Sequence, residues 1–211
     1  MLGVGEKLPD FKITGVKPGF NHHEEKGVSA FETLDSKSFP GKWKVIFFYP
    51  KDFTFVCPTE IISFSEHAAD FSAANCALVG ASCDSAFSHH AWTQLARKAG
   101  GLGKMNIPLL ADVSKKVARA YGFLVENEDD PDFDGVPLRG TAIIDAKGVL
   151  RHVSVNDAPV GRNVAEVLRL VKAFQHTDAH GEVCPSDWTP GKKTMKGDVK
   201  GSLEYLKTVK G

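Results

Sequence analysis

The sequence has no excess of charge of either sign and no long apolar run. Its 26 basic residues balance its 26 acidic residues, so the composition gives no reason to expect nucleic acid or an anionic membrane as a partner. No apolar stretch approaches the roughly 20 residues that a membrane-spanning helix requires. The opening segment MLGVGEKLPDF also lacks the basic and apolar regions of a secretory signal. We therefore expect a cytoplasmic protein that binds neither nucleic acid nor membrane.

Cysteine is scarce, with four in 211 residues and no CxxC pair. So few cysteines cannot form a disulfide scaffold, and a disulfide in a reducing compartment is more often catalytic than structural. Cys57 and Cys184 are each followed by proline in polar surroundings, whereas Cys76 and Cys83 flank an apolar strand pattern. We interpret the first two cysteines as chemical and the other two as structural.

No linker-like segment divides the chain, which favours a single domain. A buried strand pattern at 45–49 is followed by a helix at 61–74, and a second strand at 77–83 by a helix that runs to about Gly100. This alternation predicts an α/β domain with helices on both faces of a sheet. Further elements are expected as extended segments in the first 40 residues, strands at 107–111, 142–145 and 149–155, a helix at 164–174 capped by residues 161–163, and a short helix from about Val199 to Val209. The strand at 149–155 has the alternating pattern of a sheet edge, which can pair with a copy of itself.

The most informative stretch is VIFFYPKDFTFVCPTEII at 45–62. Pro50 ends an unbroken β-branched and aromatic run, and Cys57-Pro58-Thr59-Glu60 has the pattern of a helix start, with an acidic residue near the exposed amides of the first turn. A helix N-terminus commonly lowers the pKa of a thiol from about 8.5 into the range of about 3.5 to 7.5, and the thiolate is the nucleophile. Thr54 is placed to aim its hydroxyl at the sulfur. These residues favour a reactive cysteine; the alternative is a buried, inert cysteine, which is the more common state of this residue type.

The residues Pro50, Thr54 and Cys57 fit the PxxxTxxC pattern of the peroxiredoxins, and FTFVCPTE at 53–60 resembles the form found in the typical 2-Cys group. The resemblance extends along the chain through PDF at 9–11, GKWKVIFFYP at 41–50, LRGTAIID at 138–145, VGRNVAEVLRLVKAFQ at 160–175 and HGEVCPSDW at 180–188. It is strongest to the catalytic subunit of alkyl hydroperoxide reductase and its thioredoxin-dependent relatives. It implies a thioredoxin-like, three-layer α/β/α fold with an N-terminal extension. Residues 1–175 would form the peroxidase domain and 176–211 a C-terminal extended tail of the same domain.

The same resemblance implies a thiol peroxidase of antioxidant defence that uses no metal, flavin or haem. Cys57 would attack hydrogen peroxide or an organic hydroperoxide and become a sulfenic acid. Cys184 of the partner subunit would resolve it as an intersubunit disulfide, which a dithiol reductant, either thioredoxin or a dedicated flavoprotein reductase, would recycle. The expected assembly is a homodimer that forms a decamer.

Four further residues acquire expected roles from the resemblance. Thr54 would hydrogen-bond the thiolate and the peroxide, and Arg139 would place its guanidinium beside them. Pro50 would shield the pocket, and Glu60 would orient Arg139. Arg139 could also serve as an ordinary ion-pairing residue at the start of a strand.

Several other interpretations stay open. A peroxide sensor or holdase chaperone could use the same oxidised oligomer, and a one-cysteine peroxidase is disfavoured by the presence of both FVCPTE and HGEVCPSDW. A disulfide exchanger would need a CxxC pair, and a cysteine hydrolase would need a positioned histidine base, for which nothing singles out His67 or His89; packing is the expected role of His89. The histidine-rich segment His22-His23-Glu24-Glu25 and the acidic loop 126–134, which lacks EF-hand spacing, are interpreted as solvated.

Overall fold

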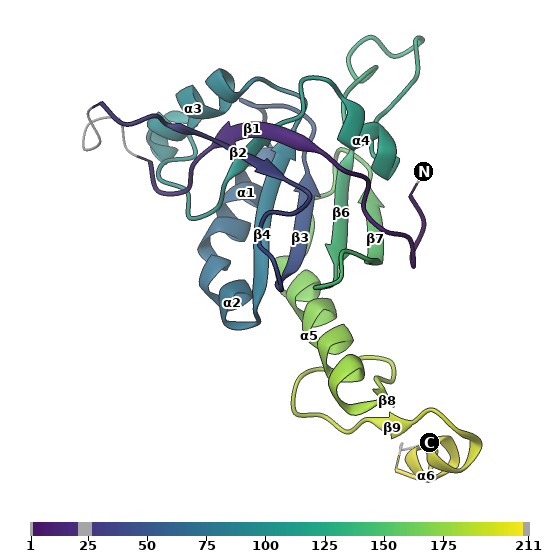
Figure 1. Cartoon of the computed structure of the whole chain (residues 1–211). Helices are drawn as coiled ribbons and strands as arrows, with labels where there is room; N and C mark the ends of the chain where they lie inside the picture. The colour runs from purple at the N-terminus through teal and green to yellow at the C-terminus, as the bar shows by residue number, and fades with distance from the viewer. Residues whose placement is uncertain (1, 21–26, 209–211) are drawn as a thin grey trace. The chain divides into compact units, whose positions relative to one another are not determined.

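The computed structural model describes residues 2–20 and 27–208 and divides into two compact units, Met1–Val164 and Ala165–Gly211 (Figure 1). The segment His22-His23-Glu24-Glu25 lies outside the described residues. None of the helices described is long and apolar enough to cross a membrane. The elements of the first unit are β1 (Lys12–Val16), β2 (Phe31–Asp35), β3 (Trp43–Phe48), α1 (Cys57–Glu66), α2 (Ala68–Ala73), β4 (Cys76–Ser82), α3 (Ala86–Gln94), the 3-10 helix η1 (Arg97–Ala99), β5 (Leu109–Ala111), α4 (Lys116–Tyr121), β6 (Arg139–Ile144) and β7 (Leu150–Asn156).

A mixed seven-stranded sheet forms the middle of the first unit, in the order β2-β1-β5-β4-β3-β6-β7. Strand β3 pairs in parallel with β4 and antiparallel with β6, and all of its residues are buried. The doubly covered strand predicted from the run at 45–49 is therefore confirmed. Strand β7 lies at one edge of the sheet, as its alternating pattern predicted.

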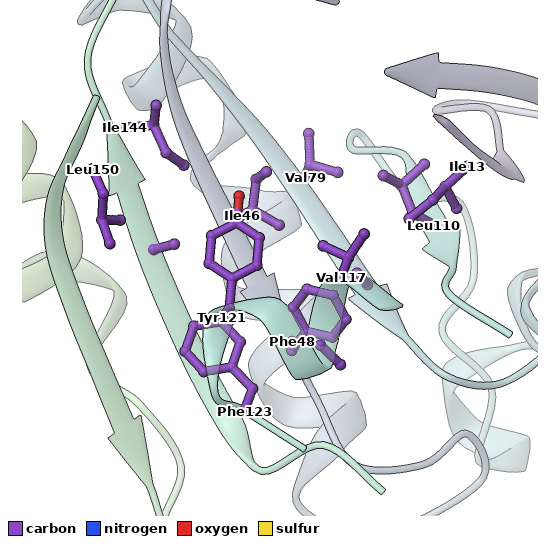
Figure 2. Close-up of a cluster of buried hydrophobic side chains, with 13 residues drawn as sticks. Ile13, Ile46, Phe48, Val79, Leu110, Val117, Tyr121, Phe123, Ile144 and Leu150 are labelled. Atoms are coloured by element: carbon purple, nitrogen blue, oxygen red, sulfur yellow. The ribbon is translucent and has the colours of Figure 1, made fainter. Parts of the chain in front are cut away.

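Side chains of β3 alternate between the two faces of the sheet, because successive residues of a strand point in opposite directions. Ile46 and Phe48 belong to a buried cluster that includes Tyr121 of α4 (Figure 2). On the opposite face Phe47 stacks on Phe64 of α1, with ring centroids 4.1 Å apart. Helices thus cover both faces, and the predicted three-layer α/β architecture is confirmed.

Two element boundaries near the site differ from the prediction. The helix expected at 61–74 is interrupted at His67, whose backbone leaves the helical region and whose ring nitrogen lies 2.8 Å from the carbonyl oxygen of Ser63. Such a side-chain contact with the backbone competes with helix continuation. Strand β6 begins at Arg139 rather than at Ala142, so the arginine is part of the sheet. The short helix α4 was not predicted, because one and a half turns show too little periodicity.

The helix predicted to run to about Gly100 ends at Gln94. The carbonyl oxygen of Leu95 accepts a hydrogen bond from the N–H of Gly103 at 3.0 Å. A Cβ atom at Gly101 would lie 2.1 Å from that same oxygen, so only glycine allows this close approach. The glycine-rich loop therefore folds back against the end of α3 and stops it.

The second unit has secondary structure of its own. It contains most of α5 (Val164–His180), the paired strands β8 (Glu182–Val183) and β9 (Met195–Lys196), and α6 (Val199–Leu206). Trp188 is 3% exposed and donates its indole N–H to the carbonyl oxygen of Lys192 at 3.0 Å. Asp198 caps α6 by accepting from the N–H of Gly201 at 2.7 Å, which confirms the helix expected from Val199. The predicted division into residues 1–175 and 176–211 stays a prediction.

Candidate active site

Cys57 is the first residue of α1, as the Cys-Pro pattern predicted. Pro58 follows in the first helical turn, where its missing N–H costs no hydrogen bond. The N-cap residue Val56 provides no side-chain hydrogen bond, so the helix terminus keeps the partial positive charge of its own amides. The thiol is 1% exposed. The sequence and the fold therefore place a buried sulfur at the positive end of a helix.

A buried polar network holds the loop that leads from β3 to this cysteine. The hydroxyl of Tyr49 donates to Asp52 Oδ1 at 2.9 Å, and His89 Nδ1 lies 2.8 Å from Asp52 Oδ2. The backbone N–H of Asp52 donates to Asp84 Oδ2 at 2.9 Å. Burial and then the charge of Asp52 raise the pKa of Tyr49 well above its ordinary value, so the hydroxyl remains a donor. His89 is buried, as a packing role requires, and it also positions Asp52.

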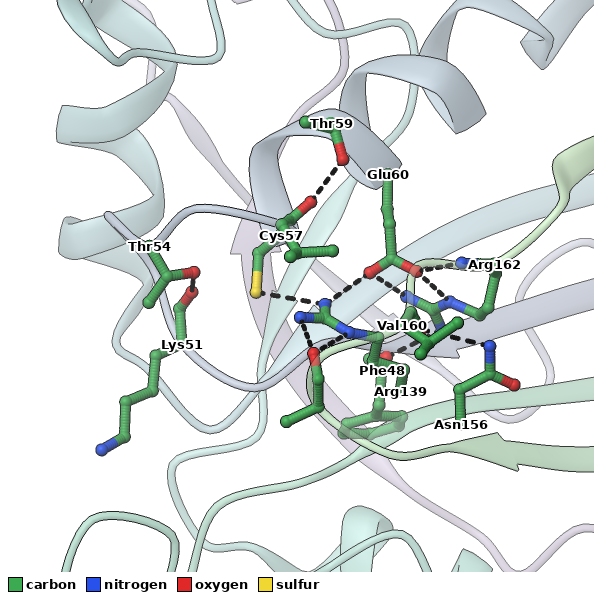
Figure 3. A network of polar contacts seen from close by, with 12 residues as sticks. Phe48, Lys51, Thr54, Cys57, Thr59, Glu60, Arg139, Asn156, Val160 and Arg162 are labelled. Atoms are coloured by element: carbon green, nitrogen blue, oxygen red, sulfur yellow. Dashed lines mark hydrogen bonds and ion pairs between the residues drawn. The ribbon is translucent and has the colours of Figure 1, made fainter.

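Arg139 reaches Cys57 from the start of β6 (Figure 3). Its Nη1 donates to Cys57 Sγ at 3.4 Å and to Glu60 Oε2 at 2.7 Å. Its Nε and Nη2 both donate to the carbonyl oxygen of Ala158, at 2.7 and 2.5 Å. The side chain is 4% exposed, so little water screens its charge. A guanidinium fixed in this way stabilises negative charge on the sulfur and on an oxygen bound beside it.

Glu60 joins Arg139 to a second buried arginine, Arg162, which the sequence reasoning missed. Glu60 Oε1 accepts from the backbone N–H and the Nε of Arg162, at 2.7 and 2.8 Å. Arg162 Nη1 also donates to the carbonyl oxygens of Phe48 and Gly140, at 2.8 and 2.7 Å. The sequence assigned this arginine to a helix cap. The only signal for its role was its place in the VGRN segment of the family resemblance.

Glu60 lies in the first turn of α1, as predicted, but its carboxylate binds two arginines. The residue is 3% exposed, and both carboxylate oxygens bind arginine. Burial raises the pKa of Glu60, but the hydrogen bonds and charges of Arg162 and Arg139 outweigh it and hold that pKa below its ordinary value of 4.5. Burial also lowers the pKa of Arg162, against the opposing effect of Glu60. Two arginines and one glutamate leave an excess positive charge beside the sulfur of Cys57.

An open pocket of about 650 Å³ leads to Cys57. Pro50, Thr54 and Arg139 line it together with the cysteine, and Glu60 adjoins it through Arg139. Five of the six predicted site residues therefore lie together in the first unit. The shielding role of Pro50 and the orienting role of Glu60 agree with these positions and stay predictions.

Thr54 differs from the expectation in its hydrogen bond. Its hydroxyl donates to the carbonyl oxygen of Lys51 at 2.9 Å instead of to the sulfur of Cys57, as Figure 3 shows. The cause is local, because threonine readily bonds a backbone carbonyl three residues earlier in a turn. The hydroxyl still lines the pocket.

The other three cysteines have different surroundings. Burial raises the pKa of Cys76 and of Cys83 to about 12, in agreement with a structural role. Cys184 lies in the second unit, half-buried, with its Sγ 3.7 Å from the carbonyl oxygen of Ala173. Burial raises the pKa of Cys184, and Arg169 opposes that rise. All four thiols are free.

A thiol at a helix start, buried beside a cation and open to a small pocket, can attack the oxygen of a small molecule and stabilise the leaving oxygen. On a mixed sheet covered by helices on both faces, this arrangement defines a thiol peroxidase. Comparison with known proteins makes the assignment specific. The chain belongs to the AhpC/TSA family, whose model matches residues 4–153, and the C-terminal domain of 1-Cys peroxiredoxin matches residues 173–208.

Relatives and solved structures agree with this family. The chain is 52% identical to peroxiredoxin-2 of Bos taurus over 203 residues, covering 96% of this chain and 94% of the relative. It is 51% identical to a thioredoxin peroxidase of Trypanosoma brucei rhodesiense over 200 residues, covering 95% and 98%. The crystal structure of reduced Plasmodium vivax 2-Cys peroxiredoxin matches with a TM-score of 0.86 and 36% identity, covering 97% and 98%. The thioredoxin-like peroxiredoxin fold and the thiol peroxidase function of antioxidant defence that the sequence predicted are confirmed.

Proposed function

We propose that this peroxidase reduces hydrogen peroxide and organic hydroperoxides with Cys57 as the peroxidatic cysteine. The observation that carries the proposal is the 3.4 Å contact between Arg139 Nη1 and Cys57 Sγ in an open pocket. The thiolate attacks the terminal oxygen, so that an S–O bond forms, the O–O bond breaks, and Cys57 becomes a sulfenic acid. The departing oxide takes a proton and leaves as water or alcohol. Arg139 offsets the charge that develops on this oxygen.

The neighbouring residues prepare that step. Glu60 holds Arg139 in place through the 2.7 Å ion pair, and Pro50 shields the pocket from bulk water. Thr54 lines the pocket and exchanges its hydrogen bond to the Lys51 carbonyl for one to the bound peroxide.

Resolution requires a second thiol. We assign Cys184 of the partner subunit, which condenses with the sulfenic acid to form a disulfide and water. Cys57 is 1% exposed, so a thiol of another subunit cannot reach its sulfur while α1 is intact. A disulfide also needs the two Cα atoms within about 7 Å of each other. The first turn of α1 therefore unwinds in each cycle. The 2-Cys peroxiredoxin structures among the neighbours support this two-cysteine cycle.

A thioredoxin-type dithiol then reduces the disulfide, a proposal supported by the relative named thioredoxin peroxidase; a dedicated flavoprotein reductase is the other candidate. We also propose a cytoplasmic location, since the cycle needs thiols that are kept reduced. The edge strand β7 can pair with its copy in a homodimer. We propose that these homodimers assemble into a decamer, in which a neighbouring dimer covers the exposed side chain of Phe87.

The experiment compares peroxide consumption by wild type, Cys57→Ser, Cys184→Ser and the control Cys76→Ser, with each product run on a non-reducing gel. We expect Cys57→Ser to be inactive and Cys184→Ser to react once without forming a linked dimer. The control should turn over and form the dimer like wild type. Normal turnover by Cys184→Ser would show that a one-cysteine cycle operates instead.

A further inference from the structure

The acidic loop between α4 and β6 forms one wall of the active-site pocket. The sequence indicated a solvated segment at 126–134, and most of its side chains are exposed. Asp130 and Phe133 are half-buried, however, and line the pocket together with Val125 and Cys57. The loop is therefore mostly solvated, as expected, but two of its side chains line the active-site pocket.

The two ends of this loop are hydrogen-bonded to each other. The N–H of Val125 donates to the carbonyl oxygen of Val136 at 2.9 Å, and the N–H of Gly135 donates back to the carbonyl oxygen of Val125 at 2.8 Å. Inside the loop, the N–H groups of Phe133 and Asp134 donate to the carbonyl oxygen of Asp130, at 3.1 and 2.8 Å. A loop with joined ends and internal turns holds its side chains in defined positions.

A lysine connects the loop to the segment that carries the cysteine. Lys51, directly after Pro50, donates from Nζ to the carbonyl oxygen of Asp132 at 2.5 Å. The same ammonium lies 5.9 Å from the centroid of the Phe133 ring, within the range of a cation–π contact. The phenyl ring is thus fixed at the pocket that leads to Cys57.

The lining combines apolar surface with negative charge. Phe55, Leu138 and Phe133 contribute apolar side chains, while Asp130 and Asp157 contribute carboxylates. The lining cations in the described part of the chain are Arg139, paired with Glu60, and Lys51, bonded to the loop. Five more acidic residues surround Asp130 in the loop: Glu126, Glu128, Asp129, Asp132 and Asp134.

We propose that Phe133 and Asp130 of this loop determine substrate specificity, favouring uncharged organic hydroperoxides with an apolar group over anionic ones. The proposal rests on the proposed peroxidase function and names the substrate class of that site. Phe133 provides apolar contact for the organic group, and Asp130 opposes an anion as it enters. Hydrogen peroxide has neither an organic group nor a charge for these two side chains to recognise, so it serves as the internal reference.

The test measures second-order rate constants for Cys57 oxidation by rapid quench and mass spectrometry. The four oxidants are hydrogen peroxide, cumene hydroperoxide, the 13-hydroperoxide of linoleic acid below its micelle concentration, and the methyl ester of that hydroperoxide. The acid and its ester carry the same hydroperoxide on the same chain, and the ester replaces the carboxylate charge with a methyl ester group. Wild-type protein should prefer the ester by roughly threefold to tenfold at low ionic strength, and salt should reduce this preference.

Phe133→Ala should lower the ratio of the cumene hydroperoxide rate to the hydrogen peroxide rate about tenfold, the low end expected for lost apolar contact in a pocket. Phe133→Leu should restore most of that ratio. Asp130→Asn should bring the acid-to-ester ratio toward one, whereas the matched control Asp129→Asn, which removes an exposed carboxylate outside the pocket lining, should leave it at the wild-type value.

Unchanged ratios in Phe133→Ala and Asp130→Asn would overturn the specificity proposal, as would an equal effect of Asp129→Asn. Failure of wild-type Cys57 to react with any of the four oxidants would instead overturn the proposed function. The two failures are therefore distinguishable.

Discussion

Helix α1 contains two glutamates that each form an ion pair with an arginine at the same distance. One pair is buried and the other is exposed to solvent. Glu60 Oε2 lies 2.7 Å from Arg139 Nη1, with side chains 2% and 4% exposed. Glu66 Oε1 lies 2.7 Å from Arg97 Nη1, with side chains 55% and 47% exposed. Glu60→Gln leaves two buried arginines without their carboxylate, a change that typically costs about 3–5 kcal/mol. Glu66→Gln removes an exposed pair, which is worth about 0–1 kcal/mol.

The assay is urea unfolding followed by circular dichroism at a fixed protomer concentration, since association raises apparent stability. The pKa of Glu60 is lower in the folded protein than its ordinary value of 4.5. The carboxylate therefore contributes its full stability above pH 4.5 and loses it as the pH falls through the folded pKa. The stability difference between wild type and Glu60→Gln should accordingly shrink in that acid range. A cost for Glu60→Gln no greater than that for Glu66→Gln would refute the idea that a buried ion-pair network supports the site.

Three other predictions concern single features of the first unit. Arg139→Lys keeps the charge but loses the forked contacts to Ala158, and we expect Cys57 oxidation to slow by about 10²-fold in rapid-quench kinetics. Burial raises the pKa values of Cys76 and Cys83 to about 12, so about one in ten thousand of these thiols is ionised at pH 8. Iodoacetamide reacts with the thiolate, and we therefore expect it to modify these cysteines in unfolded but not in folded protein, as measured by peptide mapping. Ser85→Ala removes the cap that accepts from the Ser88 N–H at 3.1 Å and should cost about 1 kcal/mol in urea unfolding, with Ser85→Asp restoring it.

Local patterns in the sequence were enough to predict the centre of the fold. The run at 45–49 has side chains that suit a strand buried on both faces, and Cys57-Pro58 carries a helix start within two residues. Both signals depend on residues that are adjacent in the chain, and the structure contains both the buried strand and the helix that begins at Cys57. Helix ends were predicted less well: the end of α3 at Gln94 depends on a glycine loop that folds back against Leu95.

The polar contacts of the site depend on residues far apart in sequence. Arg139 was found through the family resemblance, because no local pattern connects it to a sulfur 82 residues away. Arg162 lies 102 residues from Glu60 and was interpreted as a helix cap. An acidic residue in the first turn of a helix is normally exposed, so the burial of Glu60 had no sequence signal either. Composition likewise showed that the loop 126–134 is acidic, but tertiary structure decides that Phe133 lines the pocket.

The most direct test of the account is the position of the sulfenic acid. Reduced Cys184→Ser protein is treated with one equivalent of hydrogen peroxide in the presence of dimedone, which traps sulfenic acids, and the adduct is located by peptide mass spectrometry. We expect one adduct per chain, on Cys57. An adduct on Cys76 or Cys83, or peroxide consumption with Cys57 unmodified, would contradict the assignment of Cys57 as the residue that reduces peroxide.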